Sequence, residues 1–148
     1  MNNGMKALFG AVLVVLFSMF SVSCSKQNDK NIVGKWQSTM INYQSYEGEN
    51  LVEQSTENCI NWYIGFNFKS DGTGQYIEYD SEYGSSTSQV TWVIMDDKLM
   101  VTSESEQTTA TFDIHSITGS QMVLSVTEEY SYDGLRAKDI TTFTFKKI

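Results

Sequence analysis

Side chains that could carry out catalysis or bind a metal are few in this chain of 148 residues. Its one histidine, His115, ends a predicted strand and shares the outward parity of Asp113, whereas a general base must face its substrate. Zinc needs several histidine and cysteine ligands, and one histidine far from Cys59 does not supply them. No serine stands in a G-x-S-x-G or S-x-x-K motif at a strand-to-helix junction. We therefore expect no catalytic residue, no metal site, no cofactor and no enzymatic activity.

Cys24 is placed where a modification would matter. It follows an apolar run of 14 residues, Ala7–Phe20, that is preceded by Lys6. This arrangement is typical of a secretory signal peptide, and the run is short for a membrane span. The last four residues, Ser-Val-Ser-Cys at 21–24, resemble a bacterial lipobox, with serine in place of the usual leucine. The resemblance implies a lipoprotein signal peptide over residues 1–23; the alternative is an ordinary signal peptide that ends near a cysteine.

A lipidated Cys24 fixes both the expected location and the state of the second cysteine. Acyl chains such as palmitate would anchor the protein in the bacterial cell envelope, on the outer membrane, at its periplasmic face or the cell surface. Cys59 would then be unpaired and packed as a small apolar residue. The competing hypothesis, a Cys24–Cys59 disulfide, requires that Cys24 carry no lipid.

The net charge excludes one class of partner, and the length limits the number of domains. Eighteen acidic and ten basic residues give a formal net charge of −8, and the charges are spread through the chain rather than grouped. Nucleic-acid binding is driven by basic patches that neutralise phosphates, so we expect no nucleic-acid partner. The length suffices for one domain.

Alternating apolar residues predict strands throughout. The clearest case is 60–69, where Ile60, Trp62 and Ile64 begin a row of inward-facing residues and Ser70–Gly74 then supplies turn chemistry. No segment shows helical periodicity over three turns. The predicted strands number eight, at 32–43, 60–69, 74–80, 89–95, 98–102, 109–115, 121–128 and 139–147.

The connections between these strands alternate in length. The predicted long ones are 44–58, 81–88, 103–108 and 129–138, and the predicted tight ones are 70–73, 96–97 and 116–120. An up-and-down barrel places alternate connections at opposite ends, whereas a Greek-key sandwich does not sort them in this way. We therefore expect an all-β, eight-stranded antiparallel up-and-down barrel with one tight end and one open end.

Gly34-Lys35-Trp36 on the first predicted strand resembles the G-x-W motif of the lipocalin superfamily. The resemblance implies a lipocalin-like barrel over residues 32–148, after a tether at 24–31, with Trp36 packed across the closed end. Lys146 or Lys147 stands where the family usually has an arginine near this tryptophan. The mature chain is most similar to small acidic lipoproteins of Gram-negative bacteria with a lipocalin-like domain, which implies a binding protein.

Residue sizes predict a cavity in the open half of the barrel. Bulky side chains fall at the tight end (Trp36, Phe66, Phe68, Ile94, Leu99, Ile114, Met122 and Leu124) and smaller ones nearer the long connections (Val90, Val101, Ala110, Val126 and Thr141). Space above a packed base suits a small apolar or amphipathic ligand. The predicted ligand-binding residues are Met40, Ile60, Trp62, Tyr79, Val90, Phe112, Val126 and Phe143.

Tyrosines near the long connections offer a second kind of site. Tyrosine combines rigid contact area with a polar group and is frequent at recognition surfaces. The predicted rim comprises Tyr46, Tyr83, Tyr130, Tyr132 and Arg136. Two functions thus remain open: a lipid-anchored protein that holds a small ligand, or a solid-core envelope module or inhibitor that binds a protein or glycan through this rim. The sequence makes no prediction of oligomeric state.

Overall fold

The computed structural model describes residues 28–148. The predicted signal peptide, Cys24 and the first part of the tether lie outside these residues. Within them, residues 28–32 form a short helix, and nine strands follow. The strands are β1 Gly34–Glu47, β2 Asn50–Asn58, β3 Trp62–Phe68, β4 Thr73–Asp80, β5 Gly84–Met95, β6 Lys98–Ser103, β7 Thr109–Ile117, β8 Gln121–Tyr132 and β9 Leu135–Lys147.

Eight of the strands close a barrel, as the sequence predicted. The sheet order is β2-β1-β3-β4-β5-β6-β7-β8-β9, and the additional pairing of β1 with β9 closes the ring. Every pairing is antiparallel. Apart from β2, neighbours in the ring follow one another along the chain, so the up-and-down connection is also confirmed.

The ninth strand, β2, corrects the prediction of a long first loop at 44–58. Residues 44–47 extend β1, and β2 returns along it as a hairpin around Gly48 and Glu49. All nine residues of β2 are exposed. A strand that is exposed to solvent on both faces has no alternation of apolar and polar residues. The period-two pattern that identified the other strands is therefore missing here.

The partner of β1 changes part-way along its length. Its first residues, Gly34–Gln37, pair with β3, and from Met40 onward it pairs with β2. The fully buried Ser38 sits at this change: its hydroxyl accepts the Ile64 N–H at 3.0 Å and donates to the Cys59 thiol at 3.3 Å. On the other edge of β1, the register with β9 shifts between Ser38 and Met40. Thr39 is therefore a bulge residue, which reverses the facing of every later residue of β1.

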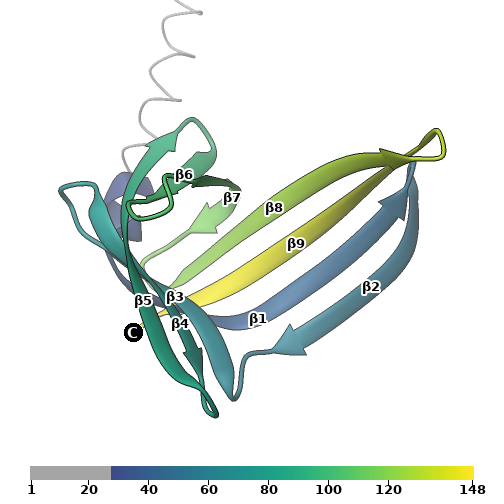
Figure 1. Ribbon diagram of the computed structural model, residues 1–148. Coiled ribbons are helices and arrows are strands. Elements are labelled where there is room, and N and C mark those ends of the chain that lie inside the picture. The colour runs from purple at the N-terminus through teal and green to yellow at the C-terminus, as the bar shows by residue number, and fades with distance from the viewer. Residues whose placement is uncertain (1–27) are drawn as a thin grey trace, which may run out of the picture.

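Beyond the closed part, the strands continue as two separate walls. Pairing of β7 with β8 stops at Asp113 and Ser125, although β8 continues to Tyr132. In Figure 1, β8, β9, β1 and β2 run side by side as one long arm, while β3, β4 and β5 extend in a different direction. We call β8–β9–β1–β2 beyond Val126 and Ile41 the long arm.

The extended strands of both walls give a second correction. The predicted connections at 81–88 and 129–138 are mostly strand, closed by short turns at 81–83 and at Asp133-Gly134. Asp133 and Gly134 have φ of 48° and 79°, which suits a two-residue hairpin turn. Residues 104–108 do form a loop, and the tight connections lie at 69–72, 96–97 and 118–120.

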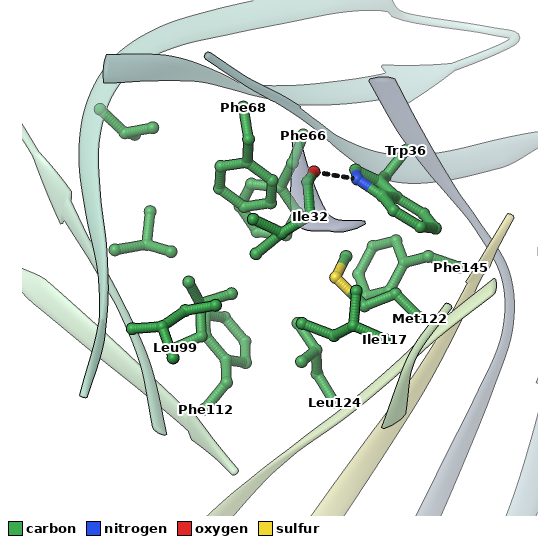
Figure 2. Packing of buried hydrophobic residues seen from close by; sticks show 13 residues of the cluster. Ile32, Trp36, Phe66, Phe68, Leu99, Phe112, Ile117, Met122, Leu124 and Phe145 are labelled. Carbon is green, nitrogen blue, oxygen red and sulfur yellow. Dashed lines mark hydrogen bonds between the residues drawn. The ribbon is translucent and has the colours of Figure 1, made fainter. Parts of the chain in front are cut away.

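The closed end is packed around Trp36, as the G-x-W resemblance implied. Trp36 is 1% exposed, and its Nε1 donates to the Ile32 carbonyl at 2.6 Å (Figure 2). Phe145, Met122 and Leu124 fill the same cluster. The Lys147 ammonium lies 5.0 Å from the Trp36 ring centroid and donates to the Asn31 carbonyl, which confirms a lysine at the arginine position.

Gly34 has a physical reason to be glycine. Its φ is +133°, and a Cβ at this position would lie 2.5 Å from Lys147 Cε. A larger residue would strain the backbone and displace the lysine from Trp36. The first and last residues of G-x-W therefore act together at the barrel base.

Replacing Trp36 tests the closed base. We expect Trp36→Ala to lower the free energy of unfolding by about 3–5 kcal/mol, since a large buried side chain is removed. Trp62 is only partly buried and its indole hydrogen bond is at the surface, so Trp62→Ala should cost about 1 kcal/mol or less. Urea denaturation of both variants makes the comparison. Equal losses would show that Trp36 does not anchor the core.

Candidate functional site

A cavity of about 620 Å³ opens above the packed base. Its deeper wall is apolar, and four of the side chains there are less than 9% exposed: Phe66, Val90, Val101 and Phe112. Ile64, Val126 and Phe143 pack against the same core. Small-molecule sites in proteins commonly have volumes of about 300–1,000 Å³, so the cavity is large enough for a ligand.

The size gradient predicted from the sequence is confirmed. All five of the smaller residues line the cavity, namely Val90, Val101, Ala110, Val126 and Thr141. Seven of the eight bulky residues are buried in the core cluster and the eighth, Ile114, packs against it. The taper from large to small inward-facing side chains therefore creates the open volume.

Half of the predicted ligand-binding set lines this cavity. Val90, Phe112, Val126 and Phe143 do so, whereas Met40, Ile60, Trp62 and Tyr79 do not. Binding by the first four stays a prediction, because no ligand is present.

Met40 and Ile60 are corrected by strand geometry. Met40 pairs with Thr144 and is 37% exposed, because the bulge at Thr39 turns it outward. Ile60 is 83% exposed and lies between β2 and β3, so it is outside the strand that was predicted to begin at residue 60.

Trp62 and Tyr79 lie beyond the cavity wall. Trp62 shares the inward parity of Ile64, but it stands at the outer end of β3, where its Nε1 donates to Glu57 at 2.7 Å. Tyr79 faces outward and stacks on Tyr63, with ring centroids 5.0 Å apart. On β4, Tyr76 pairs with Phe66, and it is therefore the even-numbered residues that face inward.

The polar mouth of the cavity was missed by sequence reasoning. It is lined by hydroxyl groups and by three carboxylates, Glu78, Glu106 and Glu128. Glu78 lies two residues from the inward-facing Tyr76, and Glu128 two residues from Val126. Continuing each strand's parity past its last apolar residue would have found both. The hydroxyl residues are Tyr76, Ser86, Ser88, Ser103, Thr108 and Thr141.

Tyr76 and Glu78 form a pair in this mouth. The Tyr76 hydroxyl donates to the Glu78 carboxylate at 2.8 Å. Burial, followed by the neighbouring Glu78, raises the pKa of Tyr76 well above its ordinary value. At neutral pH the phenol therefore stays protonated and neutral, and it remains a hydrogen-bond donor to Glu78.

The predicted tyrosine rim does not form one surface. Tyr130 and Tyr132 are on the inner face of the long arm, where their hydroxyls donate to Asp139 and Glu47. Tyr46 is on the outer face under Lys138, whose Nζ lies 4.9 Å from its ring. Arg136 alternates with Ala137 and shares that outer face. Tyr83 is 84% exposed in the turn between β4 and β5, two strands that extend in a different direction from the long arm in Figure 1.

Other candidate chemistry lies apart from the cavity. His115 is exposed at a register shift of β7, and its Nε2 lies 2.8 Å from the Ser125 hydroxyl. Among residues 28–148, no three His, Cys, Asp or Glu side chains are grouped closely enough to hold a metal ion. In the same residues, no helix has the length and apolarity to cross a membrane.

Comparison with known proteins adds to this picture. Residues 32–124 match the family model described as a lipocalin-like domain. The fold is similar to a lipocalin-like protein from Bacteroides uniformis, with a TM-score of 0.51 and 16% identity over 80% of this chain and 99% of that one. It is also similar to lobster apocrustacyanin A1, with a TM-score of 0.51 and 11% identity over 85% of this chain and 66% of that one. No curated protein matches the sequence.

Proposed function

Because this chain belongs to the lipocalin-like domain family, we propose that it binds a small apolar or amphipathic molecule in the cavity of its barrel. Proteins with this fold generally bind or carry small hydrophobic ligands rather than catalyse reactions. The proposal that this chain is not an enzyme rests on that family tendency.

The observation that supports this proposal is the cavity itself. The cavity has a volume of about 620 Å³, lies above a floor of buried phenylalanine and valine side chains, and opens towards a polar mouth. A ligand there would bury apolar surface, at about 25 cal/mol per Å² removed from water. The alternative, a solid-core module that binds a protein or glycan through a tyrosine rim, has less support, because the rim residues are distributed over different faces.

We also propose that lipid on Cys24 anchors the protein in the bacterial cell envelope. The support is the sequence alone: an apolar run, small residues and then a cysteine. The outer membrane remains the expected site, at either its periplasmic or its outer surface.

Such an anchor would give the cavity a defined direction. Residue 28 lies four residues after Cys24, so the two are at most about 14 Å apart. The short helix 28–32 contributes Ile32 to the closed base, and Asn31 donates to the Ile117 carbonyl there. We therefore propose that the closed base faces the membrane and the mouth faces away from it.

A bulky substitution inside the cavity tests ligand binding. We expect Ala110→Trp to weaken binding of the neutral fluorescent probe 1-aminoanthracene by about tenfold or more, because the new ring occupies the cavity. Thr111→Trp is the matched control, since Thr111 is the next residue and faces outward. Fluorescence titration of the full chain, with detergent blanks, measures both. Unchanged binding in Ala110→Trp would place the probe elsewhere.

Removing Cys24 tests the anchor. We expect Cys24→Ala to move the protein from the membrane fraction to the soluble fraction and to abolish incorporation of labelled palmitate, since acyl chains supply the membrane affinity. Cys59→Ala serves as the control and should remain in the membrane fraction. Membrane association that survives Cys24→Ala would refute lipid anchoring.

The direction of the mouth can be measured with labels at the two ends. In a Cys59→Ser background, we expect a label at Gly119→Cys, in the base turn between β7 and β8, to be quenched more strongly by a lipid-headgroup quencher than one at Tyr83→Cys. Fluorescence of the lipidated protein in liposomes gives the comparison. Stronger quenching at position 83 would reverse the proposed orientation.

A further inference from the structure

We propose that the ligand of this cavity is a cationic amphiphile, with an apolar tail in the floor and a protonated amine at the mouth. This inference rests on the proposed binding function and adds the charge of the ligand to it. Two features carry it: the sign of the groups that line the cavity, and the distribution of charge between the two faces of the long arm, which share Glu128.

The lining of the cavity carries charge of one sign. Glu78, Glu106 and Glu128 contribute carboxylates, and no lysine, arginine or histidine of the described residues lines it. The three come from different places around the mouth: strand β4, the loop between β6 and β7, and strand β8. An anionic head group would meet only like charge and hydroxyls, whereas an ammonium group would meet carboxylates of opposite charge.

Depth separates the apolar and acidic parts of the lining. Phe66 and Phe112 at the floor are 2% and 8% exposed, while the three glutamates are exposed at the mouth. Exposed carboxylates keep their hydration, so they can receive a cation without the cost of burying an unpaired charge. A molecule that enters tail first would place its head group among them.

The long arm extends the same charge beyond the cavity. Residues that pair directly share a face of the sheet, so Glu128, Asp139, Ser45 and Glu53 form one inward row. Glu47 and Glu57 are on this face as well, through their pairing with Ala137 and Ile41.

The basic residues of the arm are on the opposite face. Arg136 and Lys138 alternate with Ala137 and Asp139, so they face outward. In the described strands of the long arm, the inner face thus holds five carboxylates and no basic residue. The alternation of side chains between the two faces of a strand does not by itself place acidic and basic residues on different faces. The separation of charge is therefore a specific property of this inner surface.

Tyrosines on this inner face remain neutral and support cation binding. Burial, then the carboxylate of Asp139, raises the pKa of Tyr43, and a hydrogen bond to Glu47 raises the pKa of Tyr132. Their rings offer faces for cation–π contact along the path to the mouth. A metal ion fits less well than an organic cation, because no three acidic side chains of residues 28–148 are grouped closely enough to hold one.

Three probes with the same tail and different head groups test this proposal. Octylamine, 1-octanol and octanoate would each compete with 1-aminoanthracene for the full chain in a non-ionic detergent at neutral pH. We expect octylamine to displace the probe at a concentration about tenfold lower than octanoate, with 1-octanol between them. Octanoate that competes as well as octylamine would overturn the proposed charge of the ligand while leaving the proposed binding function intact.

Variants assign the preference to the mouth. We expect a triple variant, Glu78→Gln with Glu106→Gln and Glu128→Gln, to reduce the preference for octylamine over octanoate to about twofold or less while 1-aminoanthracene still binds. Glu129→Gln is the matched control, because Glu129 is adjacent to Glu128 but pairs with Lys138 on the outer face. An unchanged preference in the triple variant would overturn the role of the mouth. If the wild-type chain bound none of the four compounds, the binding function itself would fail.

Discussion

Along one edge of β1, the hydrogen-bonding partner changes from β3 to β2, and the closed barrel ends where this exchange occurs. The exchange leaves backbone groups of β3 without a neighbouring strand, and the buried Ser38 hydroxyl satisfies one of them at Ile64. A buried donor without a partner costs about 1–3 kcal/mol, so a side chain that replaces the missing strand is needed here. The Thr39 carbonyl and hydroxyl add bonds to the Cys59 N–H and the Thr144 carbonyl, which hold the bulge in place.

The two ends of the barrel differ because inward-facing residues become smaller and then polar along β8 and β9. On β9 the inward series runs from Phe145 through Phe143 and Thr141 to Asp139; on β8 it runs from Leu124 through Val126 to Glu128. The same period-two geometry thus produces a packed base, an apolar cavity and an acidic mouth, in this order from the closed end to the open end. Trp36 closes the base, and its bond to Ile32 ties the short N-terminal helix to the barrel.

The long arm shows how strands persist where burial no longer supports them. Twelve residue pairs of the arm lie between β1 and β9 or β8 and β9 in continuous register, although β8 beyond Val126 is exposed. Backbone hydrogen bonds, the stacked pair Tyr130 and Tyr132, and the contact of Lys138 with Tyr46 replace the apolar core there. A cross-strand contact such as that of Lys138 with Tyr46 contributes about 0.2–1 kcal/mol, which suits an extension of an existing barrel rather than an independent sheet.

The sequence by itself determined the barrel, its closed end and its cavity, because each depends on side chains with one face in the core. Apolar alternation identified eight strands, G-x-W located the base, and the small residues Val101 and Ala110 marked the open volume. Tertiary structure decided the features that a local sequence pattern does not determine. The bulge at Thr39 turned Met40 outward, and β2 formed on pairing alone, with no apolar face to reveal it. Glu78, Glu106 and Glu128 line one cavity only because the barrel closes, since residues distant in sequence meet through strand pairing and not through spacing.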